Sequence, residues 1–209
     1  MKRNTRTKIL VAGLSLFNEH GEPETTTNEI ADEADISPGN LHYHFRRKSD
    51  LIDAILAEFQ ADAKRLLQVA VDERETLHDF WLFLHLLTET TTAYRFLFRD
   101  METLVTRYPQ VQAPLRHFAR GIRASFELHL AALVRGNILK IDAADIGIVS
   151  RNLVVISLMT ERFYALVRQR DSTEDSALRV ARSVLSMLKP FARAEASHLI
   201  DEIAAPYAR

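Results

Sequence analysis

Apolar residues recur along the whole chain at the spacing of one face of an α-helix, and the strict alternation of a half-buried strand is absent. We therefore predict an all-α protein. Local signals set the helix boundaries, such as Gly21, which ends the first apolar stripe, and Ser37-Pro38, which begins the third. The predicted helices cover residues 5–20, 27–34, 38–43, 51–63, 75–91, 93–108, 111–135, 143–170 and 173–193, with Pro190 limiting or kinking the last.

The helices change in character near residue 48. Those before this point are short and capped, whereas those after it are long and mostly apolar. The change predicts an N-terminal three-helix domain over residues 1–48 and a C-terminal helical domain over residues 49–209.

The composition is that of an ordinary globular protein, with 209 residues, 47% of them hydrophobic and 26% charged, and a formal net charge of −1. The absence of cysteine excludes disulfides, thiolate metal sites and a cysteine nucleophile, and it fits a reducing compartment. The longest nearly uncharged stretch, residues 153–160, is far shorter than the roughly 20 residues of a membrane span. No apolar secretory core follows the basic N-terminus. We expect a soluble, cytoplasmic protein that does not enter a membrane.

Residues 26–45 form two short predicted helices around a tight turn at residues 35–37, which is the arrangement of a helix-turn-helix. One small core can be closed by the apolar side chains Ile30, Ala34, Ile36, Leu41 and Phe45. The outward face of the second helix starts with small residues that permit close approach to a base pair. Asn40 offers an amide that can donate to and accept from adenine, and Tyr43 offers a ring and a hydroxyl.

Charge is segregated along the first fifty residues. Residues 2–8 and 36–48 carry basic residues without acids, and residues 19–35 carry acids without lysine or arginine. Such runs are either a solvated face or an imprint of DNA binding. The side chains that could hold phosphates are Thr26, Thr27, Arg46 and Lys48. The basic segment 2–8 is either a further DNA contact or a disordered tail.

The run from Thr25 to Leu51 resembles the DNA-binding domain of TetR-type transcriptional regulators, and the resemblance extends over residues 5–59. It implies a short helix that reads the major groove. The implied base contacts are Pro38, Gly39, Asn40 and Tyr43. The implied phosphate contacts are Thr26, Thr27, His42, His44 and Lys48. Two positions depart from the family pattern: Asp35 replaces a glycine, which requires a left-handed backbone at an aspartate, and His42 replaces a tyrosine.

A single reading helix binds DNA weakly, so a two-fold dimer is expected. The helix over residues 143–167 is apolar nearly all round, and the final helix adds small and apolar residues. Either a large core within the chain or a second copy could cover these faces. The resemblance favours a four-helix bundle between the subunits of a homodimer.

The middle helices mix aromatic residues with polar ones, as a small-molecule pocket does. The candidate lining residues are Trp81, His85, Arg95, Phe98, Arg99, His117 and Tyr164. These side chains could instead be ordinary core residues, with the two arginines paired to Asp100, Glu102 or Glu161. The sequence does not identify the effector.

Signatures of an enzyme are weak. Glu195 and His198 have the Glu-x-x-His spacing of di-iron bundles, but those sites need a second copy and further carboxylates. Phosphate loops, nucleophile elbows and paired zinc-binding histidines are absent from the sequence. We expect no catalysis, no cofactor and no metal ion.

The sequence thus predicts a regulator of transcription, a repressor that binds a pseudo-palindromic DNA operator as a homodimer and responds to a small-molecule effector. The alternative is a helical interaction protein whose helix-turn-helix does not bind DNA.

Overall fold

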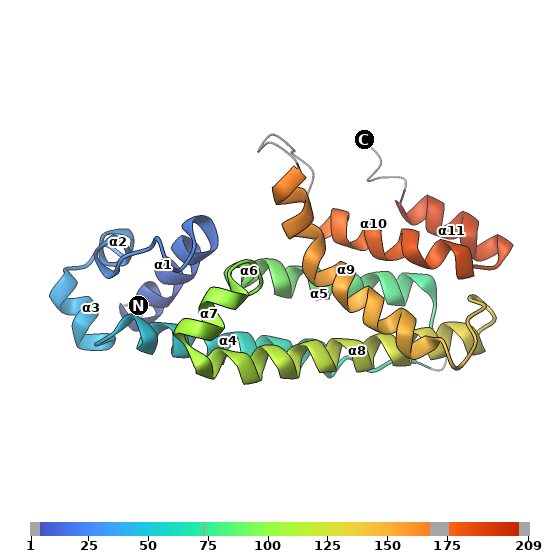
Figure 1. Cartoon of the computed structure of the whole chain (residues 1–209), viewed down its shortest axis with the longest axis horizontal. Helices are drawn as coiled ribbons and strands as arrows, with labels where there is room; N and C mark the ends of the chain where they lie inside the picture. The colour runs from blue at the N-terminus through green and yellow to red at the C-terminus, as the bar shows by residue number, and fades with distance from the viewer. Residues whose placement is uncertain (1–4, 73, 168–175, 205–209) are drawn as a thin grey trace. The chain divides into compact units, whose positions relative to one another are not determined.

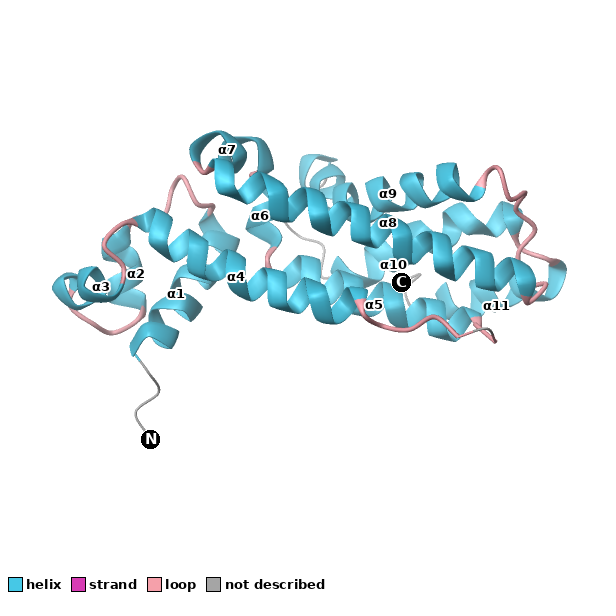
Figure 2. Ribbon diagram, turned by 90° about the horizontal axis from the view of Figure 1, so that it is seen from below, coloured by secondary structure: helices cyan, strands magenta, loops and turns pink. Residues whose placement is uncertain are grey.

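The structure is a computed structural model that describes residues 5–72, 74–167 and 176–204. Within these ranges the chain forms helices joined by loops, and no strand is present beyond an isolated bridge between Leu139 and Ala192 (Figures 1 and 2). The all-α prediction is confirmed. None of the described helices is both long and apolar enough to cross a lipid bilayer.

The α-helices are α1 (Thr5–His20), α2 (Thr27–Glu33), α3 (Pro38–His44), α4 (Lys48–Leu67), α5 (Leu77–Ala93), α6 (Arg95–Arg99), α7 (Met101–Arg107), α8 (Gln112–Arg135), α9 (Ile146–Val167), α10 (Ser176–Leu188) and α11 (Ala194–Ala204). Two 3₁₀ turns, η1 (Pro109–Val111) and η2 (Lys189–Phe191), precede α8 and α11.

The backbone packs into two compact units. The first comprises Met1–Ala63 and Ala93–Arg116, and thus contains α1 to α3, α4 as far as Ala63, and α6 and α7. Its core includes the fully buried Phe17 and Phe59, which lie 5.4 Å from the ring of Phe96 and 5.3 Å from the ring of Tyr94, respectively. These contacts attach α6 to the DNA-binding region predicted from the sequence.

Local capping explains the short helices α2 and α3. The Thr26 side chain accepts a hydrogen bond from the Glu29 backbone, and the Glu29 carboxylate accepts one from the Thr26 backbone, forming a capping box. Ser37 caps α3, and Pro38 occupies its first turn. Asp35 adopts φ 54°, which confirms the left-handed turn expected there.

The second unit comprises Lys64–Thr92 and His117–Arg209. Its core contains Phe80 and Phe83 of α5 and Phe126 of α8, with the rings of Phe83 and Phe126 packed edge to face at 5.5 Å. The buried face of α10 packs against α9.

Three predicted helices need correction. The helix expected over residues 93–108 is divided into α6 and α7 at Asp100, whose φ of −106° and ψ of 22° lie outside the helical region. The helix expected over residues 173–193 ends at Leu188, because Pro190 lacks the N–H that would continue it, and α11 follows as a separate helix.

The helix expected from residue 51 begins at Lys48 and continues to Leu67. Asp50 lies in its first turn and accepts a hydrogen bond from the Arg47 backbone at 3.0 Å, so it acts inside the helix rather than as its cap. Residues 168–170, which were assigned to the helix starting near residue 143, lie outside the described residues. The predicted boundary at residue 48, between a DNA-binding domain and an effector-binding domain, stays a prediction.

Candidate nucleic-acid interface

One face of helix α3 packs against the protein, and the other face is exposed to solvent. Leu41 is buried, and so is Phe45, which follows the helix. The Ser37 side chain accepts a hydrogen bond from the Asn40 backbone at 3.2 Å, which fixes the first turn. The exposed residues of α3 are Pro38, Gly39, Asn40, His42 and Tyr43. This group, called here the reading face, contains all four predicted base contacts.

The protein's own packing does not explain the composition of the reading face. Tyr43 is 83% exposed, although tyrosine has a large apolar ring. Its ring meets the ring of the half-buried His44 edge to face, at 5.2 Å between centroids. A Cβ added at Gly39 would come no closer than 4.0 Å to the Ser37 hydroxyl, so packing does not require a glycine there. Small size at Gly39 instead allows an external partner to approach the backbone closely.

The predicted phosphate contacts at α2 are accessible. Thr26 is exposed and Thr27 half-buried. The Thr26 hydroxyl lies 2.9 Å from Oε2 of Glu29 as part of the capping box. Hydrogen bonds from the Thr26 backbone and hydroxyl lower the pKa of Glu29, which keeps this carboxylate charged next to the threonines.

Lys48 was predicted to bind a phosphate, and the structure gives it a partner inside the protein. Its Nζ lies 2.9 Å from Oε1 of Glu22 and also donates to the Glu22 carbonyl oxygen. The ammonium lies 5.5 Å from the centre of the Phe17 ring, and only 20% of the Lys48 side chain is exposed. The phosphate role of Lys48 stays a prediction.

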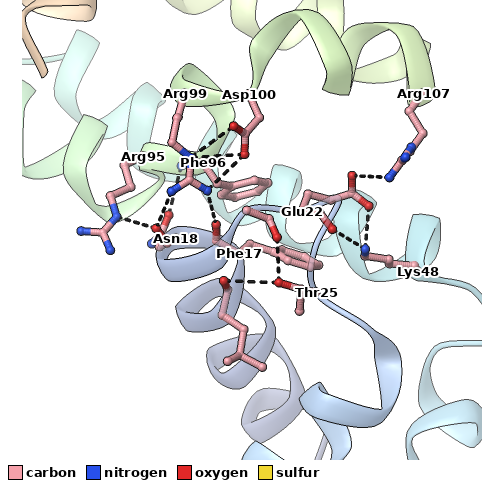
Figure 3. Close-up of polar contacts among 12 residues, drawn as sticks. Phe17, Asn18, Glu22, Thr25, Lys48, Arg95, Phe96, Arg99, Asp100 and Arg107 are labelled. Carbon is pink, nitrogen blue, oxygen red and sulfur yellow. Dashed lines mark hydrogen bonds and ion pairs between the residues drawn. The ribbon is translucent and has the colours of Figure 1, made fainter. Parts of the chain in front are cut away.

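Glu22 is the functional candidate that the sequence reasoning missed, because it was counted only as part of an acidic run. Its side chain is 0% exposed and is held by Lys48 and Arg107 (Figure 3). Tyr108 also bonds to it, and we call these four residues the Glu22 cluster. Arg107 Nη1 lies 3.0 Å from Oε2, and the Tyr108 hydroxyl donates to Oε1 at 2.7 Å.

The charges of the Glu22 cluster follow from these contacts. Burial by itself raises the pKa of Glu22, but the hydrogen bonds from Lys48 and Tyr108 and the charges of Lys48 and Arg107 outweigh it, so this pKa lies below its ordinary value. Burial and the hydrogen bond to Glu22 raise the pKa of Tyr108. At neutral pH the cluster therefore holds a buried carboxylate and a protonated phenol.

The basic segment 2–8 is partly helical. Arg6 and Lys8 belong to α1, and the Arg6 guanidinium lies 5.2 Å from the centre of the Phe45 ring. Lys2 and Arg3 lie outside the described residues. From residue 5 onward helix replaces the disordered tail, and the contact of this segment with DNA stays a prediction.

Three of the seven predicted pocket residues belong to the first unit. Arg95 and Arg99 donate to carbonyl oxygens at the end of α1, and Arg99 also pairs with Asp100 at 3.1 Å, the core arrangement considered for it above (Figure 3). Phe98 is buried and packs edge to face against Phe59 at 5.9 Å. These side chains support the fold of the unit.

The other four belong to the second unit. Trp81 stacks on His85 at 5.3 Å, and the Arg179 guanidinium lies 5.6 Å from the centre of the Tyr164 ring. His117 is exposed. The assembly of all seven residues into one effector pocket stays a prediction. A separate cleft of about 700 Å³ is lined by Thr76, Leu77, His78, Gly136, Asn137, Ile138, Arg193, Ala194, Glu195, Ala196 and Leu199.

Helix α9 carries apolar side chains that the described part of the chain leaves exposed. Its apolar residues more than half exposed are Ile148, Val155, Phe163, Leu166 and Val167, a group we call the α9 face. Leu166 is 84% exposed. In contrast, Val184, Leu185 and Leu188 of α10 are buried within the chain. Among the side chains that the structure describes in these two helices, the large apolar ones that are more than half exposed lie on α9.

Two family models match the chain. One, described as bacterial regulatory proteins of the tetR family, matches residues 9–55, and the other, described as bacterial transcriptional repressor, matches residues 58–200. A crystal structure of a TetR-family transcriptional regulator from Marinobacter aquaeolei VT8 is 29% identical, covers 100% of both chains and superposes with a TM-score of 0.84. The likeness therefore extends over both compact units.

Curated relatives match mainly the N-terminal part. The HTH-type transcriptional repressor KstR2 of Rhodococcus jostii (strain RHA1) is 36% identical over 80 residues, which are 36% of this chain and 39% of that protein. The HTH-type transcriptional regulator UidR of Escherichia coli (strain K12) is 33% identical over 116 residues, 54% of this chain and 58% of that protein. The chain thus spans less than two thirds of the length of these relatives. They and the matched families are regulators of transcription and not enzymes.

Proposed function

The chain belongs to the TetR family of bacterial transcriptional regulators, and from this premise we propose that it represses transcription by binding a pseudo-palindromic operator as a homodimer, under the control of a small-molecule effector. Repression is supported by the description of the family model that matches residues 58–200. Operator binding would place the protein with the DNA in the bacterial cytoplasm.

The reading face of α3 carries the proposal. Its five residues are exposed, and packing within the protein explains neither the glycine at Gly39 nor the exposed ring of Tyr43. The Asn40 amide can form two hydrogen bonds with adenine, and Gly39 permits the backbone to approach the groove. Pro38 and Gly39 at the start of the helix leave room for this approach, because neither carries a long side chain.

Dimer formation follows from the size of that face. One short helix contacts only a few base pairs, so specific binding requires two copies that read two half-sites on one side of the duplex. The α9 face is the described surface that suits a second copy of this chain, because contiguous exposed apolar area is unfavourable in water.

Three buried polar atoms support an effector site in the second unit. Trp81 Nε1 of α5, His129 Nε2 of α8 and Ser150 Oγ of α9 have no hydrogen-bond partner among the described residues. Such atoms destabilise a folded protein unless something bonds to them. An effector with polar groups among apolar atoms would satisfy them, and by favouring one conformation of the dimer it would change the distance between the two reading helices.

Selection of duplexes from a random library tests the DNA-binding part directly. The full-length protein is expected to enrich an inverted repeat whose half-site centres lie about one helical turn apart, or a multiple of it. Binding to that duplex should weaken steeply between about 50 and 200 mM salt because phosphate contacts release counterions. Enrichment of no sequence, together with salt-independent binding, would leave a helical interaction protein that does not use DNA.

Native mass spectrometry of the purified protein tests the effector part. A bound small molecule that lowers operator affinity when it is added back to the stripped protein is expected. Identical operator affinity with and without every molecule so recovered would contradict control by an effector.

A further inference from the structure

We infer that Glu22 is a positioning residue for operator binding: together with Lys48 and Tyr108 it fixes the loop between α1 and α2, and thereby the threonines at the start of α2. Lys48 serves this cluster and not a DNA phosphate. The inference rests on the proposed DNA-binding function and assigns roles within the same site.

Glu22 lies in a short loop whose internal hydrogen bonds connect it to the start of α2. Gly21 begins the loop in a left-handed conformation, with φ 99°. The buried Thr25 donates its hydroxyl to the Gly21 carbonyl at 2.7 Å, and its backbone N–H donates to the Glu22 carbonyl at 3.3 Å. Thr26, the N-cap of α2, follows directly. The position of Glu22 therefore sets where α2 begins.

The side-chain ammonium of Lys48 contacts both the main chain and the side chain of Glu22. An ammonium group has three N–H donors, of which one faces the Glu22 carboxylate and another the Glu22 carbonyl oxygen. The Phe17 ring lies beside the same group (Figure 3). A phosphate contact would have to use the one remaining N–H, on a side chain that is only 20% exposed, or break the pair with a carboxylate that is 0% exposed, which is strongly unfavourable.

The opposite side of the carboxylate is held from the end of α7. Arg107 is the last residue of α7, and Tyr108 follows it. Their contacts with the two carboxylate oxygens leave Glu22 bonded to α4 on one side and to the α7 end on the other. A displacement of the α7 end relative to α4 would therefore move the loop and the start of α2.

The test uses the full-length protein and the duplex selected as described above. Operator affinity is measured at several salt concentrations, at a temperature where circular dichroism shows each variant fully folded. The variants are Glu22→Gln, Lys48→Met, the double variant, and Tyr108→Phe, which removes one hydrogen bond and keeps the ring. Arg47→Met is the matched control because Arg47 is an exposed cation next to Lys48 in sequence.

The positioning role predicts that Glu22→Gln and Lys48→Met each lower operator affinity at least about fivefold. Because the two residues act together, the double variant should bind about as weakly as either single variant. The dependence of log affinity on log salt should keep the wild-type slope in all of them. Tyr108→Phe should also lower operator affinity. It therefore tests the inference even if Glu22→Gln fails to fold.

The opposite result overturns the inference. A phosphate contact at Lys48 would make Lys48→Met reduce the salt slope by about 1.8, that is about 0.9 for each of the two contacts that a bound homodimer would lose. Unchanged affinity in folded Glu22→Gln and Tyr108→Phe would show that the cluster only stabilises the fold. In both cases the wild type still binds its duplex, whereas failure of the proposed function would appear as a wild type that selects none.

Discussion

The Arg99 guanidinium donates a hydrogen bond to the Phe17 carbonyl oxygen at 2.9 Å, joining α6 to the C-terminal end of α1. Arg99 and Arg95 also donate to the Asn18 carbonyl. In return, the Asn18 side chain accepts from the Phe96 N–H at 3.1 Å (Figure 3). Because the last carbonyls of a helix and the first N–H groups of another lack partners in their own helices, each end here satisfies the other.

Replacement of Arg99 by methionine should destabilise the protein. The variant keeps the apolar stem but leaves the Phe17 carbonyl without its charged donor, and hydrogen bonds to charged groups contribute about 1.5–3 kcal/mol. Urea denaturation should show a loss of this order in the free energy of unfolding. Arg95→Met is the control, and because Arg95 is exposed, its loss should be smaller. Equal losses in the two variants would contradict the role given to Arg99.

The reading face makes a separate prediction about specificity. Asn40→Ala should relax base preference at one position of each half-site and cost roughly 1–3 kcal/mol on the preferred base. Competition binding with single-base operator variants measures both effects. Gln60→Ala, an exposed amide on α4, is the control and should bind like the wild type. An Asn40→Ala variant that still discriminates every base as the wild type does would remove Asn40 from base reading.

Sequence predicted best where local chemistry sets the structure. The helices expected over residues 27–34 and 38–43 match α2 and α3 to within one residue, because the caps at Thr26 and Ser37 lie in the sequence itself. The left-handed turn at Asp35 was predictable for the same reason.

Sequence predicted least where distant residues meet. The pairing of Glu22 with Arg107 joins residues far apart in the chain, and no local pattern indicates it. The break at Asp100 accompanies the ion pair with Arg99 in a segment whose apolar spacing remains helical. Glu195 and His198 belong to α11, which begins at Ala194, just after the last helix predicted from the sequence.

The Glu22 cluster predicts a dependence of stability on acid. A carboxyl whose pKa is lower in the folded than in the unfolded protein stabilises the fold above its unfolded pKa, and this contribution disappears as the pH falls through the folded pKa. The wild type should therefore exceed Glu22→Gln in the free energy of unfolding at pH 7, and the difference should shrink below about pH 4.3, the ordinary glutamate pKa. Urea denaturation at several pH values measures it, and a constant difference would contradict the folded charge state.

The buried pair of His129 and Glu75 in the second unit should contribute strongly to the free energy of unfolding. His129 Nδ1 lies 2.5 Å from Oε1 of Glu75, both side chains are at most 3% exposed, and the imidazole packs against Phe83. His129→Ala removes the partner of a buried carboxyl and should cost about 3–5 kcal/mol in the free energy of unfolding. The double variant Glu75→Gln with His129→Ala should recover part of this loss. A double variant less stable than the sum of the two single changes would contradict the pairing.

The α9 face predicts the oligomeric state. A glutamate in place of Leu166, which is 84% exposed, should leave the folded monomer nearly unaffected because the side chain has little contact with its own chain. Within a dimer, however, the same change would bury a charge without a partner, which is strongly unfavourable. Sedimentation equilibrium should therefore show a dimer for the wild type and a weaker dimer or a monomer for Leu166→Glu. Operator affinity should fall as well, because the two half-sites are no longer bound together.

Leu82→Glu is the control, because it places the same new charge at a 51% exposed leucine on α5. This variant should leave the dimer intact. A Leu166→Glu variant that dimerises as tightly as the wild type would place the subunit contact elsewhere.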